Sequence, residues 1–246
     1  GSSAASDVYK RQIVSLGNVC KWLGEVAESL GVEVYPGFSA AEVLIDEDDK
    51  VYGVATGDMG VSKDGIAKDS WESGMELHAK YTLFSEGARG SLSKFLIDNF
   101  ELSKESDHQK YAIGIKELWE VKEENHQEGL VEHSMGWPLS EGTGGGSFLY
   151  HFGQNLVSIG YVVHLNYTNP YVSPFDEFQQ FKTHPSIKKI LEGGKRISYG
   201  ARAITAGGFQ SVPKLFFPGG ALIGCSAGFL NYPKIKGTHL SLIHIS

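Results

Sequence analysis

The sequence has little cysteine and no long apolar run, and each shortage excludes a class of protein. Cys20 and Cys225 are the only cysteines among 246 residues, too few for a disulfide scaffold or a four-cysteine metal or iron–sulfur site within this chain. No apolar run reaches the roughly 18 residues that a membrane-spanning helix needs. The longest uncharged candidate, residues 215–230, is interrupted by Pro218 and four glycines, so it predicts a buried strand and a tight turn.

Positive charge and metal-binding spacings are also scarce. The chain has 29 acidic and 22 basic residues and a net charge of −7, which argues against nucleic acid as its main partner. Its nine histidines form no H-E-x-x-H motif and no pair on one helix face, so we predict no mononuclear metal site. The G-x-G-x-x-G fingerprint of dinucleotide-binding units does not occur either.

Glycine, in contrast, is abundant. It accounts for 31 of 246 residues, beside only 8 prolines, whereas globular proteins average about 7% glycine. Glycine lets the backbone turn tightly or approach a ligand closely. The composition therefore predicts a soluble globular protein in which main-chain atoms form part of a binding site.

Apolar periodicity predicts an α/β segment in the first hundred residues. Asn18 is a good N-cap for a helix that ends near Gly31, and residues 32–36 then predict a short strand. A hairpin is predicted over 41–56. The remaining predictions here are a polar glycine-rich loop over 57–65, a strand over 76–84 and a helix over 91–100.

From about residue 108 the pattern changes to longer strands rich in aromatic and β-branched residues, which is typical of an antiparallel sheet. Residues 173–191 predict a helix broken near Pro185. Near Thr205 the first pattern returns, with a strand, a turn, a second strand and a glycine loop. The order of these segments predicts one domain inserted into another.

The segment Gly224-Cys225-Ser226-Ala227-Gly228 follows a hydrophobic strand. Small residues at such a point let backbone N–H groups reach an anionic ligand, although a tight corner packed on itself would have the same composition. The segment also matches G-x-S-x-G, the nucleophile elbow of hydrolases. No acidic residue follows Ser226 in this sequence, so we set the hydrolase interpretation aside.

Two further glycine motifs remain ambiguous from the residues alone. Glu86-Gly87 follows a predicted strand, where it could serve a ribose hydroxyl or a phosphate, or form an ordinary strand-to-helix turn. Gly144-Gly145-Gly146 precedes the aromatic strand Phe148–His151. These glycines could bind a flat carbonyl ligand such as a quinone, or form a flexible hairpin loop.

Taken together, several long segments resemble the electron-transfer flavoprotein–ubiquinone oxidoreductase family. The resemblance extends from about Ile13 to His239, and Cys225 stands where this family has Gly-Cys and many other flavoproteins have Gly-Asp. The matching segments include VATGDMGVSKDG, EGARGSLSK, GGSFLYH, HPSIKKILEGGKRISYGARA, PKLFFPGGALIGCSAGFLN and PKIKGTH.

The resemblance implies an α/β (α+β) fold, with an FAD-binding domain of the glutathione-reductase-like type interrupted by an inserted antiparallel-sheet ubiquinone-binding domain. The implied boundaries are 13–107 and 205–239 for the FAD-binding domain and 108–204 for the inserted domain. The implied enzyme lies on the inner membrane surface, at the mitochondrial matrix face or the bacterial cytoplasmic face. It passes electrons from electron-transfer flavoprotein to ubiquinone through FAD, and its [4Fe–4S] cluster has no ligands in this chain.

The resemblance also implies roles for particular residues. Gly145 and Gly146 would meet the quinone carbonyl, and no residue is implied as catalytic or as a metal ligand. The residues implied to line FAD are Glu86, Gly87, Gly224, Ala227, Gly228, Gly237 and Thr238.

The chain departs from the family pattern in several places. Gly144 replaces a tyrosine, the glycine fingerprint and the cysteine-rich domain are missing, and residues 1–12 and 240–246 match nothing in the family. We therefore expect an internal fragment with foreign ends, which binds FAD weakly or not at all and is inactive alone. The alternatives are another FAD-dependent oxidoreductase of this fold, such as a hydroxylase or a polyprenyl reductase, or a non-catalytic fragment.

Overall fold

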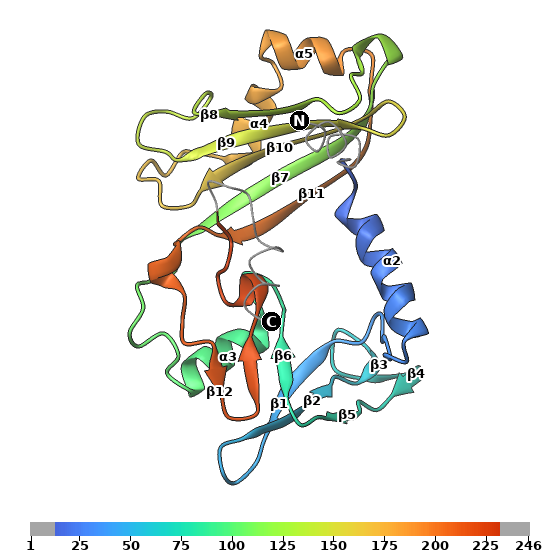
Figure 1. Ribbon diagram of the computed structural model, residues 1–246, viewed down its shortest axis with the longest axis vertical. Helices are drawn as coiled ribbons and strands as arrows, with labels where there is room; N and C mark the ends of the chain where they lie inside the picture. Colours follow the sequence, from blue (N-terminus) through green and yellow to red (C-terminus); the bar gives the residue numbers. More distant parts are fainter. Residues whose placement is uncertain (1–12, 232–246) are drawn as a thin grey trace, which may run out of the picture. The chain divides into compact units, whose positions relative to one another are not determined.

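The computed structural model describes residues 13–231 and divides the chain into two compact units (Figure 1). The first unit joins the residues up to Val34 to Ala112–Ala203, and the second joins Tyr35–Tyr111 to the residues from Ile204 onward. Each unit is therefore built from two separate stretches of sequence. No helix among residues 13–231 has the length and apolar character needed to cross a membrane.

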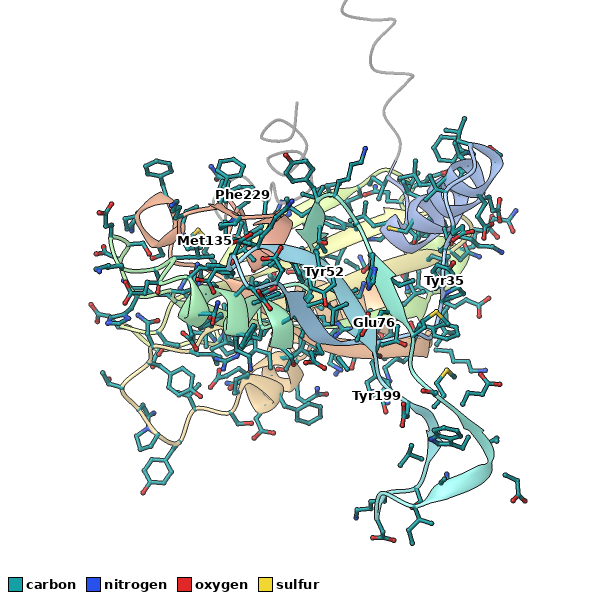
Figure 2. The ribbon with its side chains drawn as sticks, turned by 90° about the horizontal axis from the view of Figure 1, so that it is seen from below. Tyr35, Tyr52, Glu76, Met135, Tyr199 and Phe229 are labelled. Atoms are coloured by element: carbon teal, nitrogen blue, oxygen red, sulfur yellow. The ribbon has the colours of Figure 1, made fainter. Side chains whose placement is uncertain are left out.

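The first unit is built on a five-stranded sheet with the order β11-β7-β10-β9-β8. The strands β7, β10 and β9 pair antiparallel, as the aromatic and β-branched runs predicted, and β8, which was not predicted, pairs antiparallel with β9. Met135 and Tyr199 lie on the two edge strands and are 83% and 77% exposed (Figure 2). The bounds are β7 Tyr111–Glu120, β8 Val131–Met135, β9 Gly145–Phe152, β10 Leu156–His164 and β11 Lys195–Thr205.

Two short helices, α4 (Pro174–Phe181) and α5 (Pro185–Leu191), pack on this sheet. Each starts with a proline. Proline suits the first helical position because an N–H there would have no acceptor within the helix. The Ser173 hydroxyl caps α4 by accepting the Asp176 N–H at 3.3 Å. The predicted helix with a break near Pro185 is confirmed. The buried core between helices and sheet contains Leu149, Val157, Ile159, Tyr161, Val163, Phe178, Phe181, Ile187 and Leu191.

The helix α2 (Leu16–Ser29) confirms the first helix prediction, beginning slightly earlier than expected. The strand predicted over 32–36 is wrong. Gly31 has φ +85° and the Val32 N–H returns to the Ala27 carbonyl, so the chain turns at the helix end. The residues that follow are exposed and belong to no strand.

The second unit contains the predicted hairpin, now β1 (Ala40–Ile45) and β2 (Val51–Thr56). Its other important feature is a parallel strand pair, β6 with β13, in which Gly220 lies opposite Thr82 and Leu222 opposite Phe84. A buried core of apolar residues, including Phe84, Leu96 and Leu222, holds α3 beside this pair. The remaining bounds are β3 Met59–Val61, β4 Ala67–Glu72, β5 Glu76–His78, β6 Thr82–Phe84, α3 Ser91–Asn99, β12 Phe216–Phe217 and β13 Gly220–Leu222.

One predicted strand of this unit is in fact two. Residues 76–84 contain β5, which pairs with β2, and β6, which pairs with β13 in a different sheet. The residues between them carry the chain from one sheet to the other. The predicted loop over 57–65 also contains β3, which forms an exposed hairpin with β4.

A buried histidine gives the first unit a pH-dependent stability. His151 is 1% exposed, and its Nδ1 accepts the Gln127 N–H at 3.0 Å, so the ring is neutral with its proton on Nε2. Burial lowers the pKa of His151 from its ordinary value of 6.5, and the nearby His126 lowers it further. Protonation would also remove the acceptor that holds Gln127.

A group with a depressed pKa in the folded state stabilises the fold above its unfolded pKa, and this contribution is lost as the pH falls through the folded pKa. We therefore expect the free energy of unfolding to decline as the pH is lowered below 6.5. In urea titrations, His151→Asn, which keeps an acceptor near Nδ1, should be less stable at neutral pH but show a shallower decline. A decline in His151→Asn as steep as that of the wild type would contradict this account.

Candidate functional site

The candidate site lies where the parallel strands β6 and β13 end. Both strands point the same way, so the segments that follow them, 85–90 and 223–228, leave from the same edge of the sheet. The Ser226 hydroxyl donates to the Gly87 carbonyl at 3.2 Å and joins the two segments directly. Two motifs that are separated by more than a hundred residues thus form one structure.

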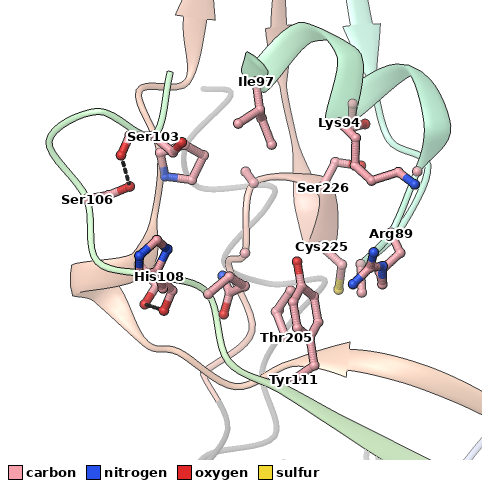
Figure 3. Close-up of a pocket in the computed structure, with 18 of the residues that line it drawn as sticks. Arg89, Lys94, Ile97, Ser103, Ser106, His108, Tyr111, Thr205, Cys225 and Ser226 are labelled. Atoms are coloured by element: carbon pink, nitrogen blue, oxygen red, sulfur yellow. Dashed lines mark hydrogen bonds between the residues drawn. The ribbon is translucent and has the colours of Figure 1, made fainter. Parts of the chain in front are cut away.

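A cavity of about 340 Å³ opens beside these segments and lies wholly within the second unit. Figure 3 shows Arg89 and Lys94 toward one end of it and Ser103, Ser106 and His108 toward the other. The first turns of α3 and the residues before Tyr111 complete the walls. The cavity has both charged and apolar sides, as expected for a small-molecule site.

Glycines are required at two points of this wall. Gly87 has φ +86° and Gly228 has φ +77°, a left-handed conformation that other residues adopt only with strain. A Cβ atom at Gly228 would also lie 2.6 Å from Nε2 of Gln109. The backbone at both positions therefore borders the cavity without a side chain in the way.

Arg89 places a positive charge in the cavity. Its guanidinium carbon lies 5.2 Å from the centre of the Tyr111 ring, within the range of a cation–π contact. Lys94 adds a second cation on the same side, whereas Asp98 and Asp107 also border the cavity. Arg89 and Lys94 together give one end of the cavity the charge that an anionic ligand needs.

Thr205, a residue of the cavity wall, has a buried hydroxyl that makes no hydrogen bond to residues 13–231. The whole residue is 3% exposed. A buried hydroxyl without a partner costs about 1–3 kcal/mol in proteins. A ligand in this cavity could supply the missing partner.

Neither Cys225 nor Ser226, the two candidate nucleophiles in the cavity wall, is activated. Burial raises the pKa of the Cys225 thiol, so the thiolate is disfavoured. The Ser226 hydroxyl donates to a backbone carbonyl instead of a base. This arrangement suits ligand binding better than covalent catalysis, and it agrees with setting the hydrolase interpretation aside.

Most of the residues predicted to line FAD gather here. Gly87, Ala227 and Gly228 line the cavity, and Gly224 begins the short 3₁₀ turn that leads to Ala227 and Gly228. Glu86 differs, because its carboxylate turns toward the start of α3 and is not part of the cavity wall. Gly237 and Thr238 lie outside the described residues, so their placement stays a prediction.

Gly145 and Gly146 lie in the first unit, inside strand β9. They pair with Val163 and Val162 of β10, and Gly146 also lies opposite Met135 of β8. A Cβ atom at Gly145 or Gly146 would approach a neighbouring strand's carbonyl oxygen to 2.3 Å. The hairpin-loop alternative is therefore wrong, and these glycines are needed for close packing of the strands.

A second cavity, of about 510 Å³, lies in the first unit, and neither Gly145 nor Gly146 lines it, although neighbours of Gly146 do. Met135 opposite Gly146 and Ser147 next to it both line the cavity. Its apolar part includes Leu149, Phe181 and Ile187, which are all at most 7% exposed. Trp137 and His184 form an aromatic wall, with ring centres 5.3 Å apart.

Sequence reasoning missed Arg89, Tyr111 and Thr205 as parts of the site. Arg89 lies in the segment 85–90, where the glutamate and the glycines carried the prediction and the arginine did not. Tyr111 and Thr205 lie close to the two positions, about 108 and 205, where the sheet-rich pattern begins and ends. This change of pattern could have indicated that they border the site. No metal-binding group of three or more suitable side chains occurs among residues 13–231.

Comparison with known proteins agrees with this organisation. Residues 111–204 match the family model described as "ETF-QO, ubiquinone-binding". Solved structures with a similar fold include the flavin-dependent brominase Bmp2, with a TM-score of 0.61 and 15% identity over 92% of this chain and 52% of that one. A variant of the halogenase PltM in complex with FAD gives a TM-score of 0.55 and 14% identity, covering 90% of this chain and 42% of that one. These likenesses establish a flavoenzyme-type fold of mixed α and β structure.

Sequence relatives are much closer. Electron transfer flavoprotein–ubiquinone oxidoreductase from Homo sapiens mitochondria is 59% identical over 94% of this chain, and the enzyme from Pseudomonas aeruginosa is 56% identical over the same share. The chain spans 38% of the human relative and 42% of the bacterial one. Over nearly all of its length, the chain is therefore similar to an internal part of electron transfer flavoprotein–ubiquinone oxidoreductases, and residues 111–204 match the ubiquinone-binding family model.

Proposed function

We propose that the cavity of the second unit binds part of FAD. The observation that carries this proposal is the cavity wall itself, which includes Arg89 and also Thr205, a residue whose buried hydroxyl has no partner among residues 13–231. FAD is rich in hydrogen-bond acceptors and carries a negatively charged diphosphate. Gly87 and Gly228 leave main chain open to such a ligand at the ends of two parallel strands, where α/β folds generally bind theirs.

When bound, FAD would supply the capacity to accept and release electrons. The residues of this chain would hold and orient it. Arg89 would attract the anionic part, Thr205 would hydrogen-bond to an oxygen or nitrogen, and the Ser226–Gly87 bond would keep the two wall segments together. By their positions, Gly224, Ala227 and Gly228 would form the floor beneath the ligand, and Gly237 and Thr238 are proposed to complete it.

For the whole protein we propose electron transfer from reduced electron-transfer flavoprotein through FAD to ubiquinone, with attachment to the inner membrane surface. The names of relatives that are 56–60% identical support this activity. The family's [4Fe–4S] cluster does not fit this chain, because such a cluster takes four cysteines and the chain has Cys20 and Cys225 alone. No step in this chain's chemistry therefore passes through a cluster.

We further propose that ubiquinone binds in the first unit beside Gly145 and Gly146. The second cavity lies next to Gly146 and combines an apolar floor with an aromatic wall, which suits a flat ring with a hydrocarbon tail. The match of residues 111–204 to a ubiquinone-binding family model supports the same placement.

The FAD proposal is tested by a substitution whose effects on stability and binding have opposite signs. Thr205→Val keeps the shape of the side chain and removes the unpaired hydroxyl. Without ligand, we expect the valine variant to be more stable by about 1–3 kcal/mol, because the buried hydroxyl has no partner. FAD affinity should fall by about twofold to tenfold, the value of one neutral hydrogen bond.

Urea unfolding without FAD and titration of FAD fluorescence with this chain measure the two effects. Thr205→Ser, which keeps a hydroxyl, is the matched control and should retain more of the FAD affinity than valine. A valine variant that is less stable and binds FAD as well as wild type would contradict the proposal. A wild-type chain that does not bind FAD even at high concentration would instead favour the non-catalytic alternative.

A further inference from the structure

Glu86 makes an unusually complete set of contacts for a carboxylate at the edge of a ligand cavity. Its Oε2 accepts both the Ser93 N–H and the Ser93 hydroxyl at 2.6 Å, and its Oε1 accepts the Leu92 N–H at 3.3 Å. Ser93 is itself only 3% exposed. All three donors belong to the first turn of α3, so the carboxylate is directed toward the helix.

The helix needs this help because of the residue that precedes it. The N-cap position of α3 is Gly90, which has no side chain to accept the free N–H groups of the first turn. Glu86 supplies the acceptor from four residues upstream. Its negative charge also lies at the positive end of the helix dipole, which strengthens the interaction.

Because Gly90 has no side chain, the Glu86 carboxylate has room to reach the helix. A Cβ atom at Gly90 would lie 2.3 Å from Glu86 Cβ and 2.5 Å from Glu86 Oε2. Any side chain at position 90 would therefore displace the carboxylate from its donors. The two residues act together, with the glycine making room and the glutamate capping the helix.

We propose that Glu86 is a positioning residue of the FAD site and does not itself contact the ligand. The inference rests on the proposed FAD cavity of the second unit. The turn from Glu86 to Gly90 is fixed at one end by the carboxylate on α3 and next to it by the Ser226 hydroxyl on the Gly87 carbonyl. This turn carries Gly87 and Arg89, two parts of the cavity wall.

The charge arrangement supports this role. A carboxylate aimed into the cavity would oppose an anionic diphosphate, whereas a carboxylate engaged by three donors of α3 leaves the Arg89 charge unopposed nearby. Direct recognition of a ribose hydroxyl by Glu86 would require it to leave these donors. The cap and the ribose contact would therefore compete for the same oxygens, three of whose acceptor sites are already taken by α3.

The test measures the cap and the ligand site separately in this chain. Amide hydrogen exchange of Leu92 and Ser93 reports the cap without FAD, and titration with FAD reports the site. Glu86→Ala should speed exchange at both amides by about fivefold or more, the usual effect of losing a helix cap. It should also weaken FAD binding by a similar factor, since Arg89 and Gly87 lose their support.

Glu86→Gln keeps one acceptor at the same reach and should rescue part of both effects, whereas Glu86→Asp is too short and should resemble alanine. Glu47→Gln, which alters an exposed carboxylate in the β1–β2 turn, should change neither. Unchanged exchange in Glu86→Ala would overturn the cap. Lost protection with unchanged FAD affinity would overturn the positioning role.

Two other outcomes are decisive as well. Unchanged exchange together with a large loss of FAD affinity would mean that Glu86 contacts the ligand directly, against the inference. A wild-type chain that binds no FAD would overturn the proposed function and, with it, the role of Glu86 toward the ligand. In that case the exchange data would still establish or refute the cap.

Discussion

Glu117→Ala should lower the free energy of unfolding of the first unit by about 3–5 kcal/mol, the usual result of breaking a buried ion pair by removing one partner. Glu117 lies in β7 and is 2% exposed. Lys182, just after α4, donates to both carboxylate oxygens at 2.9 Å. The Lys182 side chain is only 14% exposed, so removal of the carboxylate would leave its ammonium without its counter-ion in a largely buried position.

Two further donors complete the network around this carboxylate. Trp119 Nε1 donates at 2.8 Å and Arg196 Nη1 at 3.1 Å, so β7, β11 and the end of α4 all meet at one group. Arg196 is 45% exposed and can turn to solvent when Glu117 is removed. Most of the expected loss therefore arises from Lys182 and from the space left by the side chain.

The pH dependence of this effect is fixed by the pKa of Glu117. Burial raises that pKa, but hydrogen bonds from Lys182, Trp119 and Arg196 outweigh burial and hold it below the ordinary value of 4.5. The charged carboxylate therefore adds stability above pH 4.5, and this contribution is lost as the pH falls through the folded pKa.

Urea unfolding followed by circular dichroism can check both statements. Glu117→Gln should be clearly less stable than wild type at neutral pH, and the difference should shrink in acid, where the wild-type carboxyl is also neutral. The exposed pair Glu101–Lys104 offers a control, because Glu101→Gln should change stability by less than about 1 kcal/mol. A glutamine variant whose deficit stays constant into acid would contradict the assigned role.

The elements that could be predicted from the sequence are those whose structure is determined by residues close together in the chain. The hairpin over 41–56 alternates around a polar turn, and Pro185 must begin or break a helix. The strand over 76–84 could not be divided correctly, because the change of partner from β2 to β13 depends on distant residues. The edge strand β8 was missed for a related reason, since its five residues are all exposed and show no apolar alternation.

The candidate site shows the same distinction. Glycines at 87 and 228 could be singled out because a left-handed backbone requires that residue type. The unpaired hydroxyl of Thr205 and the contact of Arg89 with Tyr111 involve residues brought together only by the fold. The position of Glu86 in its motif predicted a contact with the ligand, but the motif could not show that its carboxylate accepts hydrogen bonds from Leu92 and Ser93.

In the intact protein, Gly146→Ala should reduce the rate of ubiquinone reduction by about tenfold or more, equivalent to at least about 1.4 kcal/mol in the barrier. The added Cβ would approach the Ser134 carbonyl oxygen to 2.3 Å, so β8 must shift away from β9. Ser134 and Met135 of β8 line the second cavity, and its shape would change where the quinone is proposed to bind. Reduction of FAD by the donor flavoprotein should remain near the wild-type rate.

The matched control is Gly160→Ala in the adjacent strand β10. A Cβ there would approach the Phe148 ring to 2.3 Å, and Phe148 does not line the second cavity, whereas a Cβ at Gly146 meets the backbone of Ser134, which does line it. We expect Gly160→Ala to lower thermal stability as Gly146→Ala does, while quinone reduction per folded protein stays close to wild type. Measuring both half-reactions on each variant separates the two causes. Equal losses of quinone reduction in both variants would mean that activity follows the stability of the sheet, and the quinone would then have to bind elsewhere.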